Sequence, residues 1–250
     1  MTEPPDADIA PAGVPLPTGK AKERAVRAMF DRIAPRYDVL NGVLTFGQDT
    51  RWRRATARAL QLPPSSVVLD VACGTGDLCR ELAAGGFTPV GVDVSWGMLV
   101  AGRRVAPLLQ ADALRLPVRS GAADGVTCGF ALRNVVEIPG LFEEFARALR
   151  PGGRVSILEV AEPASRLLRT GHGLYFRHIV PLVGGLLSDR AAYRYQPKSV
   201  AYLPPLAELL AAAGFTSVLS SPMGLGAVRV TTGTRTQHAS VRCSPRPTRA

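Results

Sequence analysis

Hydrophobic positions in the middle of the chain follow two different spacings. The runs SVVLDV (66–71) and TPVGVDV (88–94) are short and mostly apolar, as buried strands are, whereas LCRELAAG (78–85) and LFEEFARAL (141–149) repeat their apolar positions every three or four residues, as helices do. Strands that alternate with helices in this way are typical of a parallel sheet built by right-handed crossovers. We therefore predict an α/β fold with a mostly parallel sheet.

Hydrophobic spacing, together with proline and glycine, also predicts the remaining elements. A helix over about 26–33 must end near Pro35, because a proline ring does not fit a helix interior. A turn, RPGG at 150–153, precedes a strand. After Pro163 the alternation stops for a long helical and irregular segment that reaches about Pro205. Further helices are expected at 50–60, at about 98–105 and up to residue 213, and further strands at 108–112, 125–130, 154–160, 216–221 and 227–235.

The composition and the two ends of the chain define one domain. Residues 1–19 and 236–250 are biased in composition and have no hydrophobic period, so we predict that both tails are disordered. The remaining 20–235 reads as a single domain with an insertion at about 163–205. A chain of 250 residues, 46% of them hydrophobic, can bury one sizeable core.

The net charge of +10 favours contact with polyanions. Both a nucleic acid and an anionic membrane surface fit that charge, which does not choose between them. The apolar segment GLYFRHIVPLVGGLL (173–187) is shorter than the roughly 20 residues that span a bilayer, and it contains Arg177, His178 and Pro181. The N-terminus opens with acidic residues and prolines and lacks the basic and then apolar run of a secretory signal, so we expect a cytoplasmic protein.

The spacing of the cysteines argues against a metal site. Cys73, Cys79, Cys128 and Cys243 form no CxxC pair, and no histidine lies nearby in the sequence to complete a zinc site. We therefore expect free thiols and no bound metal.

The segment VLDVACGTGDL runs from a strand through a glycine-bearing turn into a helix, and such turns bind ligands in α/β sheets. Gly74 and Gly76 let the backbone approach a ligand, but Cys79 replaces the third glycine of the dinucleotide fingerprint. Asp70 and Asp77 flank the turn and would repel a pyrophosphate. They suit a ligand that carries a positive ammonium and a positive sulfonium.

Two further strand ends carry acids. Asp93 follows the next strand and can accept hydrogen bonds from both hydroxyls of a ribose. Asp112 follows the third strand and can accept from an adenine amine, while the backbone N–H of Ala113 can donate to a ring nitrogen. An acid at each of three successive strand ends, beside a glycine turn, predicts a site for S-adenosylmethionine (SAM).

Four stretches of the chain carry a resemblance to a known family. They are MFDRIAPRYDVLNGVLTFGQDTRWRR (29–54), VLDVACGTGD (68–77), GFALRNV (129–135) with RALRPGGRVSILEV (147–160), and AAYRYQPKSVAYLP (191–204). Over roughly 29–235 the chain resembles the class I SAM-dependent methyltransferases and, within them, the ubiquinone/menaquinone biosynthesis C-methyltransferase family. The resemblance implies a Rossmann-like fold, with a seven-stranded sheet, helices on both faces and an α-helical lid as the insertion.

The resemblance also implies which residues bind the cofactor. By motif, the family's SAM-contacting positions fall on Thr75, Asp93 and the Asp112–Ala113 pair. The chain departs from the family pattern in four places: Cys73 for a glycine, Gly129 for a serine, FALRN for FGLRN, and MGLG (223–226) for a TGG motif. These departures bear on the identity of the methyl acceptor more than on the cofactor.

The reaction that the resemblance implies is methylation of a ring carbon in a polyprenylated hydroquinone. SAM is then the expected cofactor and a lipid quinol the expected partner. Demethylmenaquinol, a naphthoquinol, is the expected acceptor, because Arg-rich and Lys-poor usage resembles actinobacterial members of the family. Such a protein would work in the cytoplasm, in transient contact with the inner face of the membrane. Other quinols, other small aromatics and the oligomeric state stay open.

Candidates for the chemistry lie in the family-specific segments. Tyr37 and Asp38 follow the first helix, and Tyr195 lies in the insertion, so each could position the ring or relay a proton. Aromatic packing under a lid accounts equally well for Tyr195. Arg133 and Asn134 follow the fourth strand, close to the site by topology, and could equally brace that turn.

Two other functions are alternatives. Trp52 with Arg51, Arg53 and Arg54 could bind nucleic acid, as in an RNA methyltransferase, or could cover the substrate entrance. The chain lacks both the Asn-Pro-Pro-Tyr-like motif of exocyclic amine methylases and the Pro-Cys nucleophile of RNA carbon methylases, so we expect no nucleic-acid partner. A catalytically silent SAM-binding protein would have lost the acidic strand ends, which are present.

Overall fold

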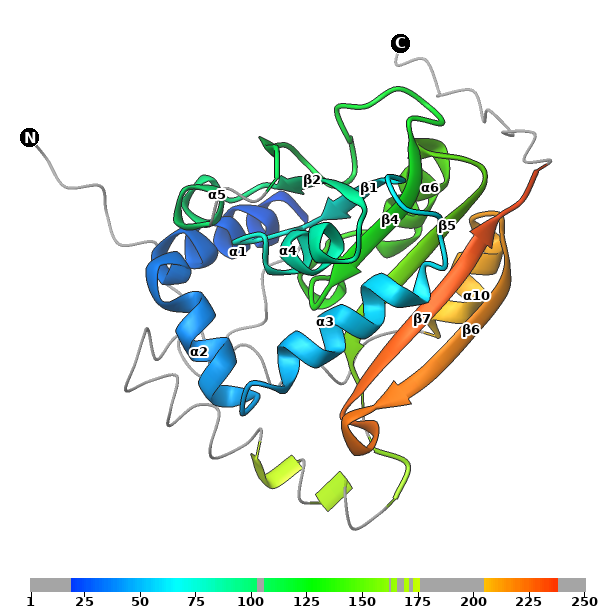
Figure 1. Cartoon of the computed structure of the whole chain (residues 1–250). Helices are drawn as coiled ribbons and strands as arrows, with labels where there is room; N and C mark the ends of the chain where they lie inside the picture. Colours follow the sequence, from blue (N-terminus) through cyan, green and yellow to red (C-terminus); the bar gives the residue numbers. More distant parts are fainter. Residues whose placement is uncertain are drawn as a thin grey trace, which may run out of the picture.

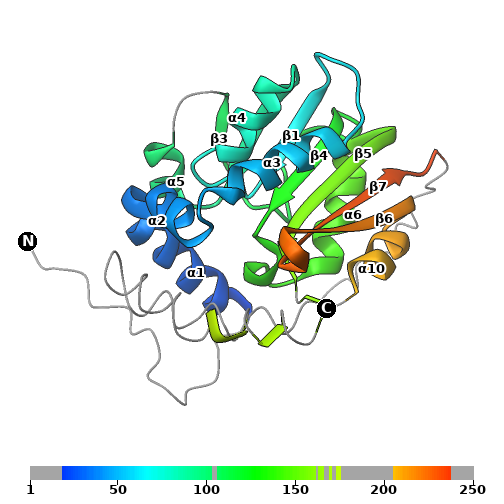
Figure 2. The ribbon, with the colours of Figure 1, turned by 60° about the horizontal axis from the view of Figure 1, so that its bottom comes forward.

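Helices precede the sheet in the chain. The computed structural model describes residues 19–102, 106–161, 163–165, 169–170, 173–175 and 205–237. Within them, α1 (Gly19–Ile33) ends at the 3₁₀ turn η1 (Ala34–Arg36), α2 (Tyr37–Leu44) follows at once, and α3 (Gln48–Ala59) begins after a short turn. Figure 2 shows α1, α2 and α5 (Trp96–Ala101) grouped at one end of the molecule.

A seven-stranded sheet forms the centre of the described structure (Figure 1). Its strands lie in the order β3-β2-β1-β4-β5-β7-β6, and all neighbours pair in parallel except β7, which is antiparallel to both β5 and β6. The chain moves outward from β1 to β2 on one side and to β4 on the other, so a crevice is expected at the carboxyl ends of β1 and β4. The bounds are β1 Val67–Val71, β2 Thr88–Asp93, β3 Leu108–Gln110, β4 Ala123–Gly129, β5 Leu149–Val160, β6 Phe215–Met223 and β7 Val228–Arg235.

Helices cover both faces of this sheet, as predicted (Figure 1). α3 and α4 (Asp77–Ala84) lie on one face, and α6 (Ile138–Ala148) and α10 (Leu206–Ala212) lie on the other. Two short 3₁₀ turns, η2 (Leu132–Asn134) and η4 (Gly224–Gly226), follow β4 and β6.

Strand β1 shows why its sequence is almost continuously apolar. Val68 packs with Leu82 on the α3 and α4 face, whereas Leu69 and Val71 pack with Phe142 on the α6 face. A parallel strand covered by helices on both sides has no solvent-facing side, and its side chains therefore do not alternate between apolar and polar. This packing fixes the strand from which the glycine turn begins.

The order of strands and helices agrees with the sequence prediction apart from one additional helix, and some bounds differ. The helix predicted to reach about residue 105 ends at Ala101. The sequence pattern did not reveal α2, because Pro35 was expected to end the helical structure; instead Pro35 lies within η1 and a new helix starts at Tyr37. The predicted turn at 150–153 lies within β5, where the pairing jumps from Ala123↔Leu149 to Gly125↔Arg154. Four residues there lie opposite a single residue of β4, so the turn persists as an irregularity of the strand.

Most of the predicted insertion lies outside the described residues, as do residues 1–18 and 238–250 of the two predicted disordered tails. Tyr195 and His178 belong to that part of the chain. Among the residues that the structure describes, no helix is both long and apolar enough to cross a membrane.

Candidate active site

The glycine turn after β1 adopts a backbone that favours glycine. Gly74 and Gly76 have φ angles of 56° and 82°, in the left-handed region. A Cβ on Gly74 would meet no atom within 4 Å, so the turn presents bare backbone to open space. A ligand can therefore approach the main chain closely at this point.

Asp93, at the end of β2, holds this turn in place. One carboxylate oxygen accepts from the backbone N–H of Gly74 at 2.8 Å, and the other accepts from that of Ser95, also at 2.8 Å. Burial raises the pKa of Asp93, while the hydrogen bonds that it accepts oppose the shift. Each carboxylate oxygen has a further lone pair, so the side chain can accept more hydrogen bonds from a ligand.

A cavity of about 310 Å³ lies over the carboxyl ends of these strands, and we name it the cofactor cavity. Four of the predicted cofactor residues line it: Gly74, Asp93, Asp112 and Ala113. Asp112 is exposed and accepts a hydrogen bond from the backbone N–H of Leu114 at 2.9 Å. The cavity is thus largely apolar with an acid at two of its strand ends, as a nucleoside site is.

The other predicted cofactor residues do not line the cofactor cavity. Asp70 and Thr75 line a smaller space of about 40 Å³ next to the cofactor cavity, and Gly76 lines neither. Asp70 is 1% exposed and accepts hydrogen bonds from the Thr127 hydroxyl at 2.9 Å and from the Cys79 thiol at 3.3 Å. These contacts stabilise the turn and leave Asp70 without direct access to the cofactor cavity.

Helix α1 forms one wall of the cofactor cavity and is fixed by Asp31. One oxygen of its carboxylate accepts from the Ser95 hydroxyl at 2.6 Å and from the backbone N–H of Gly97 at 2.8 Å. Phe30, the residue before it, lines the cavity. No feature of the sequence pointed to Asp31, because its partners lie in α5 and in the turn before it.

Burial makes Asp70 a source of pH dependence in stability. Desolvation raises the pKa of Asp70 to about 7, although the bonds from Thr127 and Cys79 and the charge of Arg53 oppose the shift. The folded protein therefore keeps this proton at pH values where the unfolded chain has lost it, and stability falls as the pH rises from about 4 to about 7.

Asp70→Asn removes this titration and keeps an acceptor for Thr127. We expect the free energy of unfolding of the variant, relative to the unchanged protein, to rise by at least about 1 kcal/mol between pH 5 and pH 7. Urea denaturation at a series of pH values measures this. A difference that stays constant across the series would show that Asp70 is ionised in the folded protein.

A second cavity of about 300 Å³ adjoins the first, and we name it the acceptor cavity. Tyr37 and Phe130 line both cavities, so the two spaces meet at these rings. The floor of the acceptor cavity is aromatic, because Trp52 of α3 packs edge-on against Phe130 with ring centroids 6.5 Å apart. Tyr175 and Leu44 also line it. This cavity suits a flat apolar ring.

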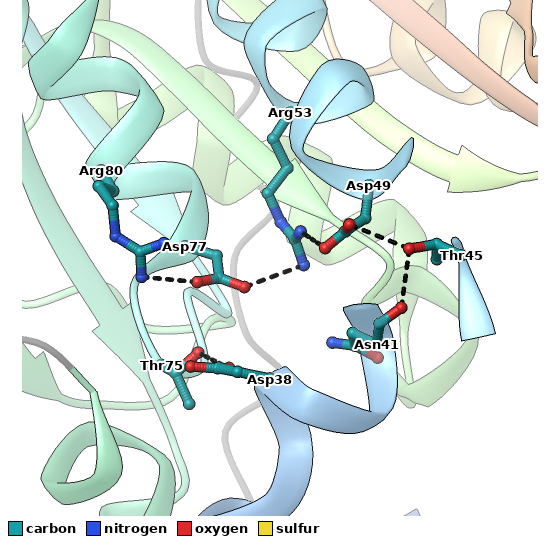
Figure 3. A network of polar contacts seen from close by, with 8 residues as sticks. All are labelled: Asp38, Asn41, Thr45, Asp49, Arg53, Thr75, Asp77 and Arg80. Atoms are coloured by element: carbon teal, nitrogen blue, oxygen red, sulfur yellow. Dashed lines mark hydrogen bonds and ion pairs between the residues drawn. The ribbon is translucent and has the colours of Figure 1, made fainter. Parts of the chain in front are cut away.

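A buried network of charges connects the acceptor cavity to the glycine turn (Figure 3). Arg53 of α3 lines the acceptor cavity and pairs with Asp49, whose carboxylate also accepts from the Thr45 hydroxyl at 2.9 Å. The same guanidinium lies 3.3 Å from a carboxylate oxygen of Asp77, the first residue of α4. Arg80 pairs with the other oxygen of Asp77 at 2.7 Å.

The contacts of Arg53 and Trp52 bear on the two interpretations of the basic segment around Trp52. Arg53 is 8% exposed and engaged with two carboxylates, so it does not contribute to a nucleic-acid patch. Trp52 is half-buried against Phe130, and both Trp52 and Arg53 line the acceptor cavity. These contacts fit the interpretation of this segment as a cover of the substrate entrance.

Of the predicted catalytic residues, Tyr37 and Asp38 take different places. Tyr37 lies where the two cavities meet. Asp38 instead accepts a hydrogen bond from the Thr75 hydroxyl at 2.6 Å, which joins α2 to the glycine turn (Figure 3). Burial raises the pKa of Asp38, and the bond from Thr75 opposes the shift. Tyr195 lies outside the described residues.

Glu159 is a residue of the site that the sequence did not suggest. It is 2% exposed, pairs with Arg133 at 2.9 Å and accepts from the backbone N–H of Leu132 at 3.1 Å. Burial raises its pKa, and the guanidinium of Arg133 opposes the shift. Arg133 also lines the acceptor cavity, while Asn134 lines the cofactor cavity. Glu159 thus holds the turn after β4, whose residues contribute to the lining of both spaces.

The cysteines agree with the sequence prediction where the structure describes them. Cys73, Cys79 and Cys128 are buried and free, and Cys243 lies outside the described residues. In the described part of the chain, no cluster of three or more His, Cys, Asp or Glu side chains could hold a metal ion.

The chain is similar to known proteins in its sequence and in its fold. The model of the ubiE/COQ5 methyltransferase family matches residues 18–235. A demethylmenaquinone methyltransferase of Roseiflexus sp. (strain RS-1) is 44% identical over 232 residues, which cover 87% of this chain and 96% of that protein. A ubiquinone/menaquinone biosynthesis C-methyltransferase UbiE of Syntrophotalea carbinolica is 42% identical over 221 residues, which cover 84% of this chain and 93% of that protein.

Among solved structures, a SAM-dependent methyltransferase of Thermotoga maritima, a possible histamine N-methyltransferase, has the same fold. It matches with a TM-score of 0.62 at 19% identity, and the match covers 84% of this chain and 99% of that one. The likeness confirms the predicted Rossmann-like methyltransferase fold.

Proposed function

This chain belongs to the ubiE/COQ5 methyltransferase family, and from that membership and the geometry of the site we propose that it methylates demethylmenaquinol at a ring carbon, with SAM as the methyl donor. The product would be menaquinol. Relatives that are 44% and 42% identical are named for the demethylmenaquinone reaction and for C-methylation in ubiquinone and menaquinone biosynthesis.

One observation of the structure supports this proposal above the others. The cofactor cavity and the acceptor cavity share Tyr37 and Phe130 as lining residues, so a donor in one and a ring in the other would lie next to each other. The two guanidinium groups of the acceptor cavity, Arg53 and Arg133, are paired with carboxylates. The cavity therefore offers a mostly apolar surface, which suits an aromatic ring better than a charged substrate.

The cofactor cavity fits SAM. Asp93 would accept from the ribose hydroxyls with the lone pairs that Gly74 and Ser95 leave available. Asp112 and Ala113 would hold the adenine, and the bare backbone at Gly74 would admit the methionine part. Asp70, Thr75 and Gly76 would set the shape of the turn without lining the cavity themselves. When bound, SAM supplies an electrophilic methyl group on a positively charged sulfur.

The methyl acceptor must be activated before its ring carbon can react. A phenol carbon is a weak nucleophile until its hydroxyl loses a proton, after which the charge delocalises onto the adjacent ring carbon. Tyr37 is placed to contact the acceptor ring where the cavities meet, so it is the described residue that we assign to positioning that ring and its oxygen. Tyr195, which lies outside the described residues, is our candidate for proton transfer.

Asp38 has a supporting role in this proposal. Its carboxylate accepts from Thr75, so it acts on the glycine turn, and it does not line the acceptor cavity. We therefore treat it as a positioning residue. Arg53 and Asp77 join the acceptor cavity to the same turn from the α3 side.

Turnover should depend on the oxidation state of the acceptor. The carbonyls of an oxidised quinone withdraw electron density from the ring, whereas the quinol can ionise and direct charge onto the ring carbon. With labelled SAM we expect transfer to reduced demethylmenaquinol and at most a few per cent of that rate with the oxidised form. Mass spectrometry of the lipid phase measures both rates, with a benzoquinol and transfer RNA as comparison acceptors. Equal rates for the two oxidation states would refute the phenolate chemistry.

We also propose that the protein meets an anionic membrane surface transiently, because its acceptor is a lipid and its net charge is +10. Liposome sedimentation should then recover more protein as the fraction of phosphatidylglycerol rises, and added salt should reverse this. Recovery that is independent of anionic lipid, together with tight and salt-sensitive RNA binding, would favour a nucleic-acid partner instead.

A further inference from the structure

Two large apolar side chains stand out at the edge of the acceptor cavity. Phe46, just after α2, is 80% exposed, and Leu225, in η4, is 79% exposed. They are the most exposed of the large hydrophobic residues that the structure describes, and both line the acceptor cavity. Neither lines the cofactor cavity. They therefore mark the open end of the acceptor cavity, away from the place where the two cavities meet.

The backbone at both positions is strained. Phe46 has a φ angle of 52° and Leu225 one of 57°, in the left-handed region where side chains other than that of glycine cost free energy. A glycine at either position would avoid this cost. Exposed apolar side chains gain little from folding, so strain and exposure at both positions indicate a requirement other than stability.

The glycines on either side of Leu225 belong to the turn that exposes its side chain. Gly224 and Gly226 are left-handed as well, with φ angles of 55° and 89°. A Cβ on Gly224 would come within 3.0–3.3 Å of the Trp52 ring, so the turn is packed directly on the aromatic floor of the acceptor cavity. The segment MGLG (223–226), where the chain departs from its family pattern, is thus a turn that presents one leucine at the cavity edge.

We infer that Phe46 and Leu225 form a subsite for the first isoprene units of the acceptor's polyprenyl chain. The inference rests on the proposed function. The ring must lie near Tyr37 and Phe130 to meet the donor, and a cavity of about 300 Å³ has little room for a long chain beyond the ring. The chain must therefore leave over the open end, where the Phe46 ring, with the Tyr175 ring 6.5 Å from it, and the Leu225 side chain offer apolar contact.

Phe46→Gly and Leu225→Gly test the subsite, because each removes the apolar side chain and relieves the backbone strain together. We expect each variant to keep or raise the Tm, so a loss of binding cannot be attributed to misfolding. KM is measured with reduced demethylated naphthoquinols that carry zero, one or two isoprene units, in buffer free of vesicles. Kd of the oxidised forms, measured by calorimetry, gives a second readout that does not depend on turnover.

The ratio of variant KM to that of the unchanged protein should increase with chain length, to about three- to tenfold at two isoprene units. Two variants of β6 serve as controls. Ser217→Gly relieves the backbone strain at a left-handed residue with a φ angle of 51°, and Leu219→Ala removes an apolar side chain that is 67% exposed. Both lie outside the two cavities, so these controls should give ratios near one at every chain length.

Three results would overturn the inference, and each would point to a different error in it. A ratio that is the same for all chain lengths would show that the two side chains do not contact the chain. A chain-length effect that arises only with phosphatidylglycerol vesicles would assign the two side chains to bilayer lipid. Absence of methyl transfer by the unchanged protein to any of the quinols would overturn the proposed function itself, and the subsite with it.

Discussion

Replacing Asp93 by alanine is expected to lower the affinity for SAM by at least tenfold. The change removes an acceptor for two ribose hydroxyls, and a hydrogen bond to a charged group contributes about 1.5–3 kcal/mol. It also removes the acceptor for the backbone N–H groups of Gly74 and Ser95, so the turn itself becomes less well fixed. Titration calorimetry with SAM measures the loss.

Two variants separate these contributions. Asp93→Asn keeps one oxygen acceptor and should lose less affinity than Asp93→Ala. Asp112→Ala removes an exposed carboxylate at the far strand end and should have the smaller effect, because water screens that group. Circular dichroism checks that each variant is folded. SAM affinity that is unchanged in a folded Asp93→Ala variant would refute the assignment of this carboxylate.

Replacing Arg53 by alanine is expected to lower the free energy of unfolding by about 3–5 kcal/mol. The side chains of Arg53 and Asp49 are each 9% exposed, and that of Asp77 is 14% exposed. Loss of the guanidinium leaves Asp49 without its charged partner in a buried place, and such an unpaired charge is costly. Urea denaturation at pH 7 measures the change.

A matched pair of variants tests the cause of this loss. Arg53→Met combined with Asp49→Leu removes both charges and fills the space, so it should lose less stability than Arg53→Ala alone. Asp77 keeps its pair with Arg80 in both variants. If the double variant were the less stable of the two, packing by the arginine side chain would explain the effect better than its charge.

The free energy of unfolding at low pH gives an independent check of the pair between Arg53 and Asp49. Burial pushes the pKa of Asp49 upward, but the charge and hydrogen bonds of Arg53 outweigh it and hold the pKa below its usual value. A carboxyl with a lowered pKa stabilises the folded state above its unfolded pKa of about 3.9, and this contribution is lost as the pH falls through the lower, folded value. The difference between Arg53→Ala and the unchanged protein should therefore shrink at low pH.

The strand ends of the candidate site could be predicted from the sequence because sheet geometry brings them together. Gly74, Asp93 and the Asp112–Ala113 pair lie in three separate stretches of the chain, yet each follows or ends a parallel strand, and the carboxyl ends of such strands lie at one edge. Periodicity alone located the strands. The chemistry of the cofactor could then be argued from the charges at that edge.

Asp70 shows the limit of that reasoning. Its position in the sequence, just before the turn, was expected to place it beside the ligand, but its side chain lies between Thr127 of β4 and Cys79 of α4. Which side chains of neighbouring elements meet an acid at a strand end depends on packing in three dimensions. No spacing in the sequence records it.

The acceptor side was harder to predict for the same reason. Arg53 and Asp77 pair between α3 and α4, and Glu159 pairs with Arg133 between β5 and the turn after β4. The sequence showed a basic segment around Arg53 but not its buried carboxylate partners. The left-handed backbone at Phe46 and Leu225 is equally hidden, because neither residue type favours it.

The position of the transferred methyl group shows whether the protein methylates a ring carbon of the quinol. The protein is incubated with SAM that carries a ¹³C methyl group and with reduced demethylmenaquinol, and the lipid product is examined by NMR and mass spectrometry. We predict one ¹³C methyl per ring, bonded to carbon, with the chemical shift of a methyl on an aromatic ring. A label on a quinol oxygen, or a label found on RNA and on no quinol, would contradict the proposed function.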